Sequence, residues 1–135
     1  ETLGITKIGY QTNKVPGFWA KETNLKVDVK INRISELIKI IENRKILKQK
    51  GCLLLYNPVP KNNSIKISII EKWIKIANNK AKKNHILGKE LTPYLLREIS
   101  LLSRGLTLKT NISLILNNAK LAGKVAYKIN KSLWK

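Results

Sequence analysis

At Gly51 the sequence changes from a helical pattern of apolar residues to an extended one. Apolar residues at helical spacing from Ile34 to Leu47 predict an amphipathic helix that begins after Asn32, its N-cap, and stops at Gly51. The continuous apolar run Cys52–Tyr56 follows at once and predicts a strand covered on both faces, and therefore central in a sheet. Helices that alternate with strands are typical of layered α/β domains.

Two further segments, residues 6–10 and 26–31, predict short strands, and the polar–apolar alternation of the second favours a half-exposed edge strand. The prolines of residues 57–60 (sequence NPVP) fix φ and remove amide donors, so the chain must break after the apolar strand. In open α/β sheets, loops that leave the carboxyl ends of strands are where ligands bind.

The second half of the chain has a mainly helical pattern. One amphipathic helix fades out within the lysine-rich residues 79–84, and Thr92 as N-cap with Pro93 at the first helical position predicts another to about Leu102. Thr107 can cap a long final helix. We therefore expect an α/β fold with about three short strands and four helices, the C-terminal portion of a layered fold. For the helix that fades out within residues 79–84, the predicted buried side comprises Ile69, Ile70, Trp73, Ile74 and Ala77.

Length, composition and cysteine content bound the class of protein. At 135 residues with 43% hydrophobic residues, the chain fits one globular domain. No apolar run approaches the roughly 18 residues that a membrane span needs. The N-terminus, Glu1 to Gly4, lacks an initiator Met and a secretory pattern, which predicts that the chain begins partway along a longer product. The single cysteine, Cys52, excludes an internal disulfide and favours core packing in an intracellular, reducing compartment.

The net charge of +19 suggests a nucleic-acid or other anionic partner. Lysine, however, outnumbers arginine by 23 to 4, whereas arginine is preferred for recognising phosphates and bases. Ile, Lys and Asn, whose codons are AT-rich, supply 56 of the 135 residues, and the charges are spread along the whole chain. Compositional drift therefore explains the charge better than RNA binding does, and RNA stays as the alternative partner.

Two asparagines stand out on the predicted final helix. Asn111 and Asn118 share one stripe, at spacings of three and four, with Ile115, Ala122 and Val125. A buried amide without a partner costs about 1–3 kcal/mol, so each must bond either to a neighbouring loop or to a ligand. For one asparagine a backbone partner is the better interpretation, whereas for the pair a ligand is an equal alternative.

Spacing alone reveals no further chemistry. Glu90 precedes the predicted helix start at Thr92, where a carboxylate simply complements the helix dipole. His85 is the only histidine and, with one cysteine and scattered carboxylates, offers no metal-ligand spacing, so we expect no metal ligands within this chain. Neither a Gly-rich phosphate loop nor a catalytic triad is evident.

Four short blocks of sequence carry a family resemblance. They are residues 8–12 (IGYQT, with Pro16 and Phe18), 57–60 (NPVP), 88–96 (GKELTPYLL), and 111–112 (NI) followed by 117–122 (NNAKLA). In order and spacing they resemble the pseudouridine-5′-phosphate glycosidases, which include the indigoidine synthase A proteins. Because the blocks cover nearly the entire chain, the resemblance predicts that residues 1–135 are the C-terminal part of a single domain of that family, with the N-terminal part missing.

The resemblance implies an α/β/α fold, a manganese-dependent homotrimer and reversible cleavage of the C–C glycosidic bond of pseudouridine 5′-phosphate to uracil and ribose 5-phosphate. In the family, a lysine amine opens the ribose as a Schiff base, so that the bond to uracil can break with acid–base assistance. That lysine, the general-acid glutamate and the metal-binding aspartate lie upstream of this chain. The segment alone is therefore expected to be inactive, with the missing N-terminal part as its partner.

The resemblance also assigns roles to residues of this chain. Asn111 matches the family asparagine at the uracil end of the site and is the candidate catalytic residue. The candidate substrate-binding or site-shaping residues, which also match family motifs, are Asn57, Pro58, Glu90, Thr92 and Asn118.

The chain departs from the family pattern at Tyr56, which stands for a common alanine, at Lys61, which stands for an acid, and at residues 103–105, which replace a Thr-Gly-Gly turn. Together with the missing lysine and the charge of +19, these departures motivate an alternative: a catalytically inactive family member recruited as a basic structural or RNA-binding protein. Salt-dependent retention on RNA would separate the two, because displaced counterions make phosphate contacts weaken steeply with salt.

Overall fold

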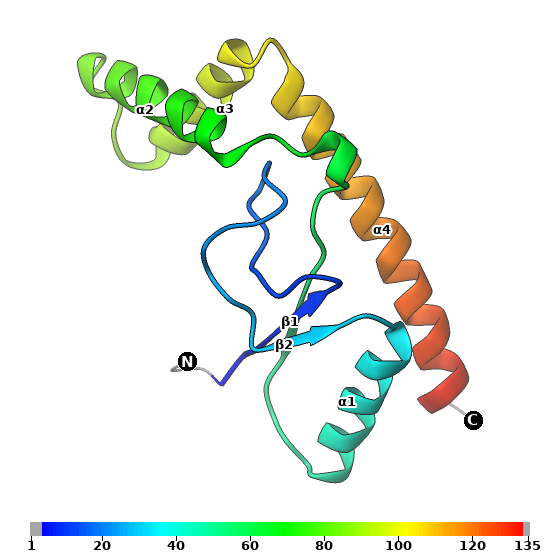
Figure 1. Ribbon diagram of the computed structural model, residues 1–135. Helices are drawn as coiled ribbons and strands as arrows, with labels where there is room; N and C mark the ends of the chain where they lie inside the picture. The colour runs from blue at the N-terminus through cyan, green and yellow to red at the C-terminus, as the bar shows by residue number, and fades with distance from the viewer. Residues whose placement is uncertain (1–3, 134–135) are drawn as a thin grey trace.

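In the computed structural model, which describes residues 4–133, two packed regions are joined by one long helix (Figure 1). Over these residues the mixed α/β class with three strands and four helices is confirmed, whereas Glu1–Leu3, used above to judge the N-terminus, lie outside them. The elements, including two short 3₁₀ turns, are β1 (Thr6–Tyr10), β2 (Val29–Ile31), α1 (Ile34–Ile46), β3 (Leu53–Tyr56), η1 (Lys61–Asn63), α2 (Ile67–Lys83), η2 (Gly88–Glu90), α3 (Leu91–Leu102) and α4 (Leu106–Leu133).

The sheet is parallel, with the strand order β2-β1-β3. The prediction that the apolar run Cys52–Tyr56 forms the central strand is wrong for this chain, because β1 is in the middle and β3 is at an edge. Leu54 is 43% exposed, so one face of β3 is not covered by the described residues. Cys52, predicted to pack in the core, is exposed because it precedes the strand.

The predicted strand at 26–31 begins later than expected. Lys26 instead pairs with Lys14 in an isolated antiparallel bridge. This bridge belongs to an extended arm, residues 11–28, which leaves β1 and folds back on itself before β2 begins (Figure 1). The arm therefore takes up residues that the alternating pattern assigns to the sheet.

Asp28 ties the end of this arm to β1. Its carboxylate accepts the backbone N–H of Lys7 at 2.8 Å and lies 3.2 Å from the Lys7 ammonium nitrogen. The backbone hydrogen bond is the main cause that lowers the pKa of Asp28 below its usual 3.8. A pKa that is lower in the folded state means that stability is gained above the unfolded pKa and is lost as the pH falls through the folded pKa.

We therefore expect Asp28→Asn to reduce the loss of thermal stability between about pH 6 and about pH 3. Circular dichroism melts at both pH values measure this loss. Glu71→Gln is the matched control, because Glu71 is exposed on α2 and takes part in no ion pair of residues 4–133. An Asp28→Asn protein that loses as much stability in acid as the wild type would contradict the assignment.

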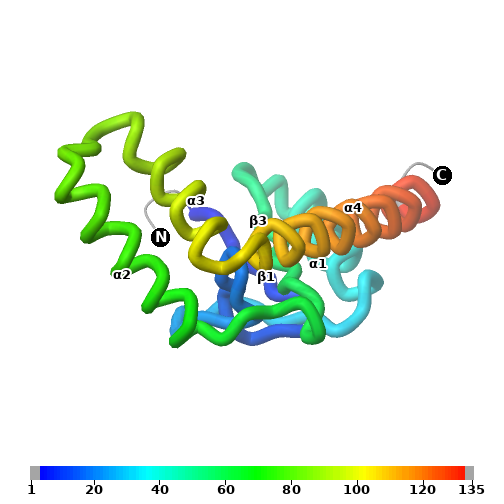
Figure 2. The backbone as a smooth tube through the Cα atoms, turned by 90° about the horizontal axis from the view of Figure 1, so that it is seen from above, coloured from blue at the N-terminus to red at the C-terminus, as the bar shows by residue number. Residues whose placement is uncertain are grey.

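The first of two cores lies on one face of the sheet. Ile8 and Ile31 are 0% and 2% exposed, and they pack in one cluster with Leu37 of α1. Val125 of α4 packs against the same cluster, so α1 and α4 cover the same side of the sheet. Seen from above, α4 crosses over the sheet and α1, whereas α2 and α3 lie to one side (Figure 2).

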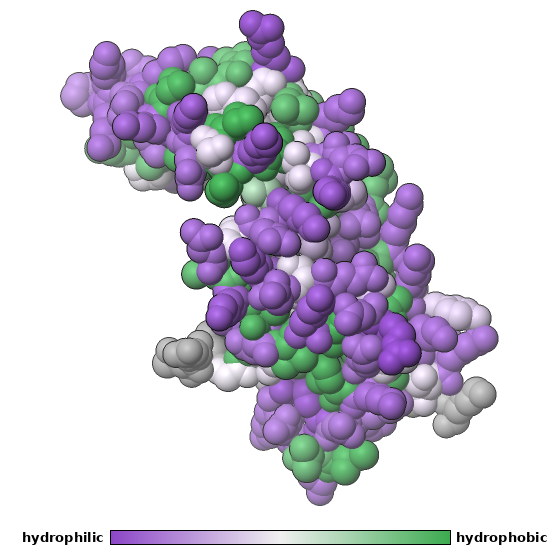
Figure 3. Space-filling view, in the orientation of Figure 1, coloured by the Kyte–Doolittle hydropathy of each residue, from purple (hydrophilic) through white to green (hydrophobic). Residues whose placement is uncertain are grey.

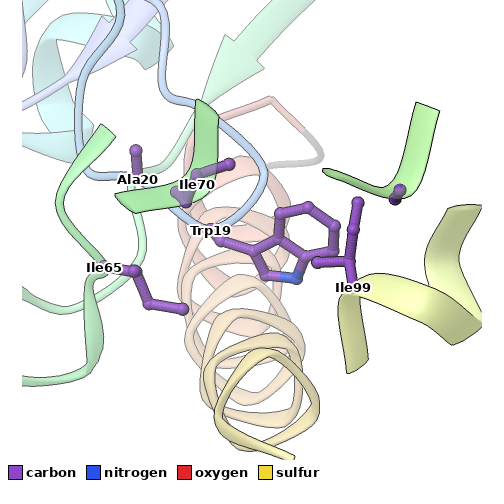
Figure 4. Packing of buried hydrophobic residues seen from close by; sticks show 6 residues of the cluster. Trp19, Ala20, Ile65, Ile70 and Ile99 are labelled. Carbon is purple, nitrogen blue, oxygen red and sulfur yellow. The ribbon is translucent and has the colours of Figure 1, made fainter. Parts of the chain in front are cut away.

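The second core joins the arm to α2 and α3. The Trp19 indole, which is 8% exposed, lies beside Ile70 of α2 and Ile99 of α3 (Figure 4). Of the side of α2 predicted to be buried, Ile69 and Ile74 are instead 40% and 37% exposed. The remaining three residues of that side, Ile70, Trp73 and Ala77, do belong to this core.

The helix α2 ends within the lysine-rich residues 79–84, as predicted. The helix continues to Lys83, because Ala81 is buried and Lys80 pairs with Glu98 of α3. The Lys80 ammonium donates to a carboxylate oxygen of Glu98 at 2.9 Å, and this hydrogen bond raises the pKa of Lys80 above its usual value.

Helix starts differ from the predicted caps. At α1, Arg33 is the N-cap, and Asn32 contributes through its backbone N–H, which donates to Glu36 at 3.0 Å. The helix ends at Ile46, before Gly51, because the chain turns at Lys48 with a φ of 51°. Backbone geometry beyond the apolar pattern therefore sets both ends of α1.

At α3, Glu90 is the N-cap, and Thr92 lies inside the first turn. At α4, Thr107 is the second helical residue and is 3% exposed, so it is not a cap. Its backbone N–H donates to the Ser103 hydroxyl oxygen at 3.2 Å. Ser103 therefore satisfies a donor at the start of α4, the role predicted for Thr107.

Candidate functional site

The carboxyl ends of the parallel strands meet at one edge of the sheet. Gly9 of β1 is paired with Tyr56, the last residue of β3, and Asn57 is the first residue beyond that strand. Gln11 follows β1 at the same edge, with a φ of 56°, and its backbone N–H donates to the carbonyl of Ile31 at 2.7 Å. Asn57 therefore lies at the edge where open α/β sheets bind ligands, as the sequence predicts.

Asparagines of α4 hold the loop that carries Asn57. The Nδ2 of Asn57 donates to the Oδ1 of Asn118 at 3.1 Å, across 61 residues of chain. One residue earlier, the Nδ2 of Asn117 donates to the carbonyl of Pro58 at 3.0 Å. The two predicted residues Asn57 and Asn118 are thus brought together, and Pro58 joins them through its backbone rather than its ring.

The row of α4 that faces the loop and the sheet is shifted by one residue, toward the N-terminus, from the predicted stripe. Thr110 is 1% exposed and donates to the carbonyl of Asn63 in η1 at 2.9 Å, whereas Ile115 of the predicted stripe is 59% exposed. The row that points inward consists of Thr107, Thr110, Leu114, Asn117 and Leu121. Sequence reasoning therefore missed Thr110 and Asn117, although their seven-residue spacing equals that of Asn111 and Asn118.

The Asn57–Asn118 pair stands beside a cavity of about 490 Å³ between β3 and α4. Their mutual hydrogen bond uses one donor and one acceptor, which leaves the Oδ1 of Asn57 and further amide hydrogens for other partners. A ligand with both a donor and an acceptor could therefore bind at this end of the cavity. Apart from the two amides, its lining is hydrophobic: Leu55, Leu121, Ala122, Val125, Ala126 and Ile129.

Asn111 lies two helical turns away, roughly 10 Å along α4, and faces a different cavity. That cavity measures about 160 Å³ and lies between the arm, α3 and α4. Phe18 and Trp19, from the first sequence block, line it together with Asn111. The half-buried Asn111 amide therefore has aromatic rings as neighbours, which the sequence pattern alone does not reveal.

Glu90, the N-cap of α3, and Thr92, in the first turn of that helix, are both exposed. Glu90 lines a third cavity, of about 250 Å³, together with Tyr94 and Arg97. The six candidate residues are thus divided among separate places: Asn57, Pro58 and Asn118 lie together, whereas Asn111 and the Glu90 region each lie elsewhere. Within residues 4–133 they do not line one common cavity.

Two further structural findings concern metals and membranes. Among the described residues, no three His, Cys, Asp or Glu side chains are grouped so that they could hold a metal ion. This part of the chain therefore does not fit a manganese site by itself. Likewise, none of the helices in residues 4–133 is both long enough and apolar enough to span a bilayer.

The bond from Asn117 to the loop can be tested in the isolated chain. Asn117→Ala leaves the carbonyl of Pro58 without its donor, so we expect a loss of about 1 kcal/mol in the free energy of unfolding in urea. Asn130→Ala, on an exposed part of the same helix, is the control and should cost less than about 0.5 kcal/mol. Equal losses for the two variants would show that the Asn117 bond does not hold the loop.

Comparison with known proteins decides the family. A sequence model described as indigoidine synthase A like protein matches residues 1–128. The chain belongs to this family. The solved structure of an indigoidine synthase A-like protein from Thermotoga maritima is 33% identical, with a TM-score of 0.80, and matches 95% of this chain and 42% of its own length. The resemblance carried by the four sequence blocks is thereby confirmed.

Named members of the indigoidine synthase A-like family are considerably longer than this chain. A pseudouridine-5′-phosphate glycosidase from Kosmotoga olearia is 40% identical over 131 residues, which cover 97% of this chain and 45% of the relative. One from Legionella pneumophila is 34% identical and covers 99% of the chain and 43% of the relative. The structure of the prealnumycin C-glycosynthase AlnA, solved in complex with ribulose 5-phosphate, matches with a TM-score of 0.84 at 26% identity. The match covers 92% of this chain and 41% of AlnA. The chain thus spans less than half the length of these relatives.

Proposed function

We propose that this chain, joined with the remainder of the family fold, forms a pseudouridine-5′-phosphate glycosidase. The remainder of the family fold means the part of its relatives that the chain does not match, more than half of their length. The proposal is supported by relatives at 40% identity that bear this name, and by a structural neighbour that binds a five-carbon sugar phosphate. The reaction would release uracil and ribose 5-phosphate by breaking a C–C bond.

One structural observation favours this function over a purely structural role. Asn57 and Asn118 meet at the carboxyl edge of the sheet, beside a cavity, and keep free hydrogen-bonding capacity there. Asn118 is exposed and Asn57 is half-buried, so a ligand in the cavity can reach both amides. A ribosyl or base group with hydroxyl, N–H and carbonyl positions would supply the remaining hydrogen bonds.

Asn111 is proposed to hold the uracil. Its amide has both a donor and an acceptor, which complement the N–H and C=O groups on the edge of uracil. Phe18 and Trp19 lie around the same small cavity, and aromatic faces stack on bases. This proposal places base recognition at the α3–α4 end of the site and the amide pair nearer the sheet.

The chemical step requires groups that these cavities do not provide. Among residues 4–133, no charged side chain lines the Asn57–Asn118 cavity or the Asn111 cavity. Opening the ribose needs an amine, and protonating the departing carbon needs an acid. We therefore assign the amine, the acid and the ligands of any manganese ion to the remainder of the family fold. The part of the chain described here then binds and orients the substrate, within a predicted homotrimer.

The function is tested in a chimaera in which this chain replaces its matched segment in the Kosmotoga olearia relative. We expect the chimaera to release uracil from pseudouridine 5′-phosphate in the presence of manganese, measured by liquid chromatography. The unaltered relative is the positive control. A folded chimaera with no turnover, beside an active control, would favour the inactive alternative, which retention on RNA at physiological salt would then support.

In this chimaera, Asn111→Ala should lower kcat/KM for uracil release by about tenfold or more, because one hydrogen-bonded contact to the base is lost. Its melting temperature should stay close to that of the parent chimaera, since Asn111 is only half-buried. Asn130→Ala, which is exposed on the same helix, should leave both quantities unchanged. Unaltered turnover of Asn111→Ala would remove Asn111 from the site.

A further inference from the structure

The long helix α4 carries a second apolar row, on a side that residues 4–133 leave exposed. Leu108, Ile112 and Ile115 are 58%, 52% and 59% exposed. Successive members of the row are three or four residues apart, so they share one side of the helix over about 27 Å. We call this row the outer face of α4; it consists of Leu108, Ile112, Ile115, Ala119, Ala122 and Ala126, all of which are exposed.

The surroundings of the outer face differ from it in chemistry. Lys120, Lys124 and Lys128 repeat every fourth residue on another side of α4 and leave the outer face without a charged residue. The surface shown in Figure 3 is largely hydrophilic, and hydrophobic residues reach it along the right-hand edge, where α4 runs. An apolar stripe on a helix normally faces a core, so a helix with two such stripes is expected to contact packed elements on both of those sides.

The shape of the outer face also suits packing against another element. Its first half presents large branched side chains, and its second half presents Ala119, Ala122 and Ala126. Small side chains allow a neighbouring helix or strand to approach closely, because the distance between packed elements depends on the side chains at the contact.

For the isolated chain, a second copy is a poor occupant, because the net charge of +19 on each copy opposes their close approach. The predicted homotrimer, by contrast, is a property of the complete protein. The Kosmotoga olearia relative has more than half of its length outside the matched segment, and the fold of this chain is retained within the longer AlnA chain at a TM-score of 0.84. A cover for the outer face is therefore available within the family fold itself.

We infer that the outer face of α4 is the surface on which the remainder of the family fold packs. This inference rests on the part of the proposed function that joins the chain to that remainder, and not on the reaction. Ala122 and Ala126 of the outer face also line the Asn57–Asn118 cavity. The packed remainder would therefore close that cavity, and the substrate site would form at the interface.

The test compares two identical substitutions in two settings. Ile115→Lys is on the outer face, whereas Ile46→Lys, at the end of α1, alters a residue that is 76% exposed and lies outside that face. In the isolated chain we expect both to shift the melting temperature by no more than about 3 °C, because both side chains are mostly exposed. In the Kosmotoga chimaera we expect Ile115→Lys to lower it by about 10 °C, because a charge would be buried, and Ile46→Lys to change it little.

Three results would overturn the inference. Equal melting temperatures of Ile115→Lys and the parent chimaera would show that nothing covers the outer face. An isolated chain that dimerises in analytical ultracentrifugation, and that Ile115→Lys makes monomeric, would assign the face to a second copy. A chimaera that shows no cooperative unfolding would mean that this chain cannot pack on the remainder. None of these measurements requires turnover, so failure of the reaction alone is a separate outcome.

Discussion

Gly9→Ala is expected to destabilise the isolated chain by roughly 3 kcal/mol, a large share of the stability of a small domain. A methyl group at Gly9 would lie 2.1 Å from the carbonyl oxygen of Thr12, a backbone atom. The backbone there has little freedom to move, because Thr12 is 3% exposed and its hydroxyl bonds to the backbone of Lys14 in both directions. Gly9 itself is fixed between Lys30 and Tyr56 in the middle strand of the sheet.

Urea unfolding followed by circular dichroism measures this loss. Gly123→Ala is the matched control, because Gly123 lies within α4 and a methyl group there meets nothing within 4 Å. Alanine is the better helix former, so this change should stabilise the isolated chain by about 0.5–1 kcal/mol. Two glycine-to-alanine changes with opposite signs are thus expected, and a tolerated Gly9→Ala would show that the turn after β1 is not close-packed.

The second large effect is expected at Trp19. Trp19→Ala should cost about 3–5 kcal/mol, since it removes the largest fully packed side chain of the core between the arm, α2 and α3, whereas Trp73 is only partly buried there. The backbone carbonyl of Trp19 also accepts the N–H of Ile65 at 2.9 Å, so the arm and the start of α2 are positioned together. Loss of the indole would enlarge the Asn111 cavity, which Trp19 also lines.

Phe18→Ala is the comparison for Trp19, because the two rings are in edge-to-face contact at 5.0 Å between centroids but Phe18 is 53% exposed. We expect it to cost less than about 1.5 kcal/mol in urea unfolding. If Phe18 contacts the base as proposed, Phe18→Ala should reduce turnover of the chimaera more than it reduces stability. Similar unfolding losses for both variants would show that Trp19 is not the anchor of this core.

Local sequence signals predicted most of the elements but not their ends. The apolar spacing that predicts α1 is correct, yet the helix starts after Arg33 and ends at Ile46. Side-chain capping propensities favour Asn32, Thr92 and Thr107, but in each case the surrounding fold supplies another arrangement. Capping contributes only about 1 kcal/mol, so packing of the helix can move its ends by a residue or two.

The candidate site was predictable only in part. Asn57 was expected at the end of a strand, because a proline-containing loop follows an apolar run there, and the structure places it so. The four-block resemblance to the family is confirmed as well. The partners Thr110 and Asn117 were not predicted, because α4 is apolar on two sides and periodicity does not say which side meets the sheet.

What the amino-acid order determined on its own is the alternation of strands and helices, the break after β3 and membership of the family. These features depend on residues that are close together in the sequence and on short motifs, both of which are visible in the sequence itself. Only the tertiary structure decided that β1 is the middle strand, which row of α4 faces inward, and that Asn57 meets Asn118. Those outcomes depend on contacts between segments far apart in the chain, where the free energy of packing chooses among patterns that are locally equivalent.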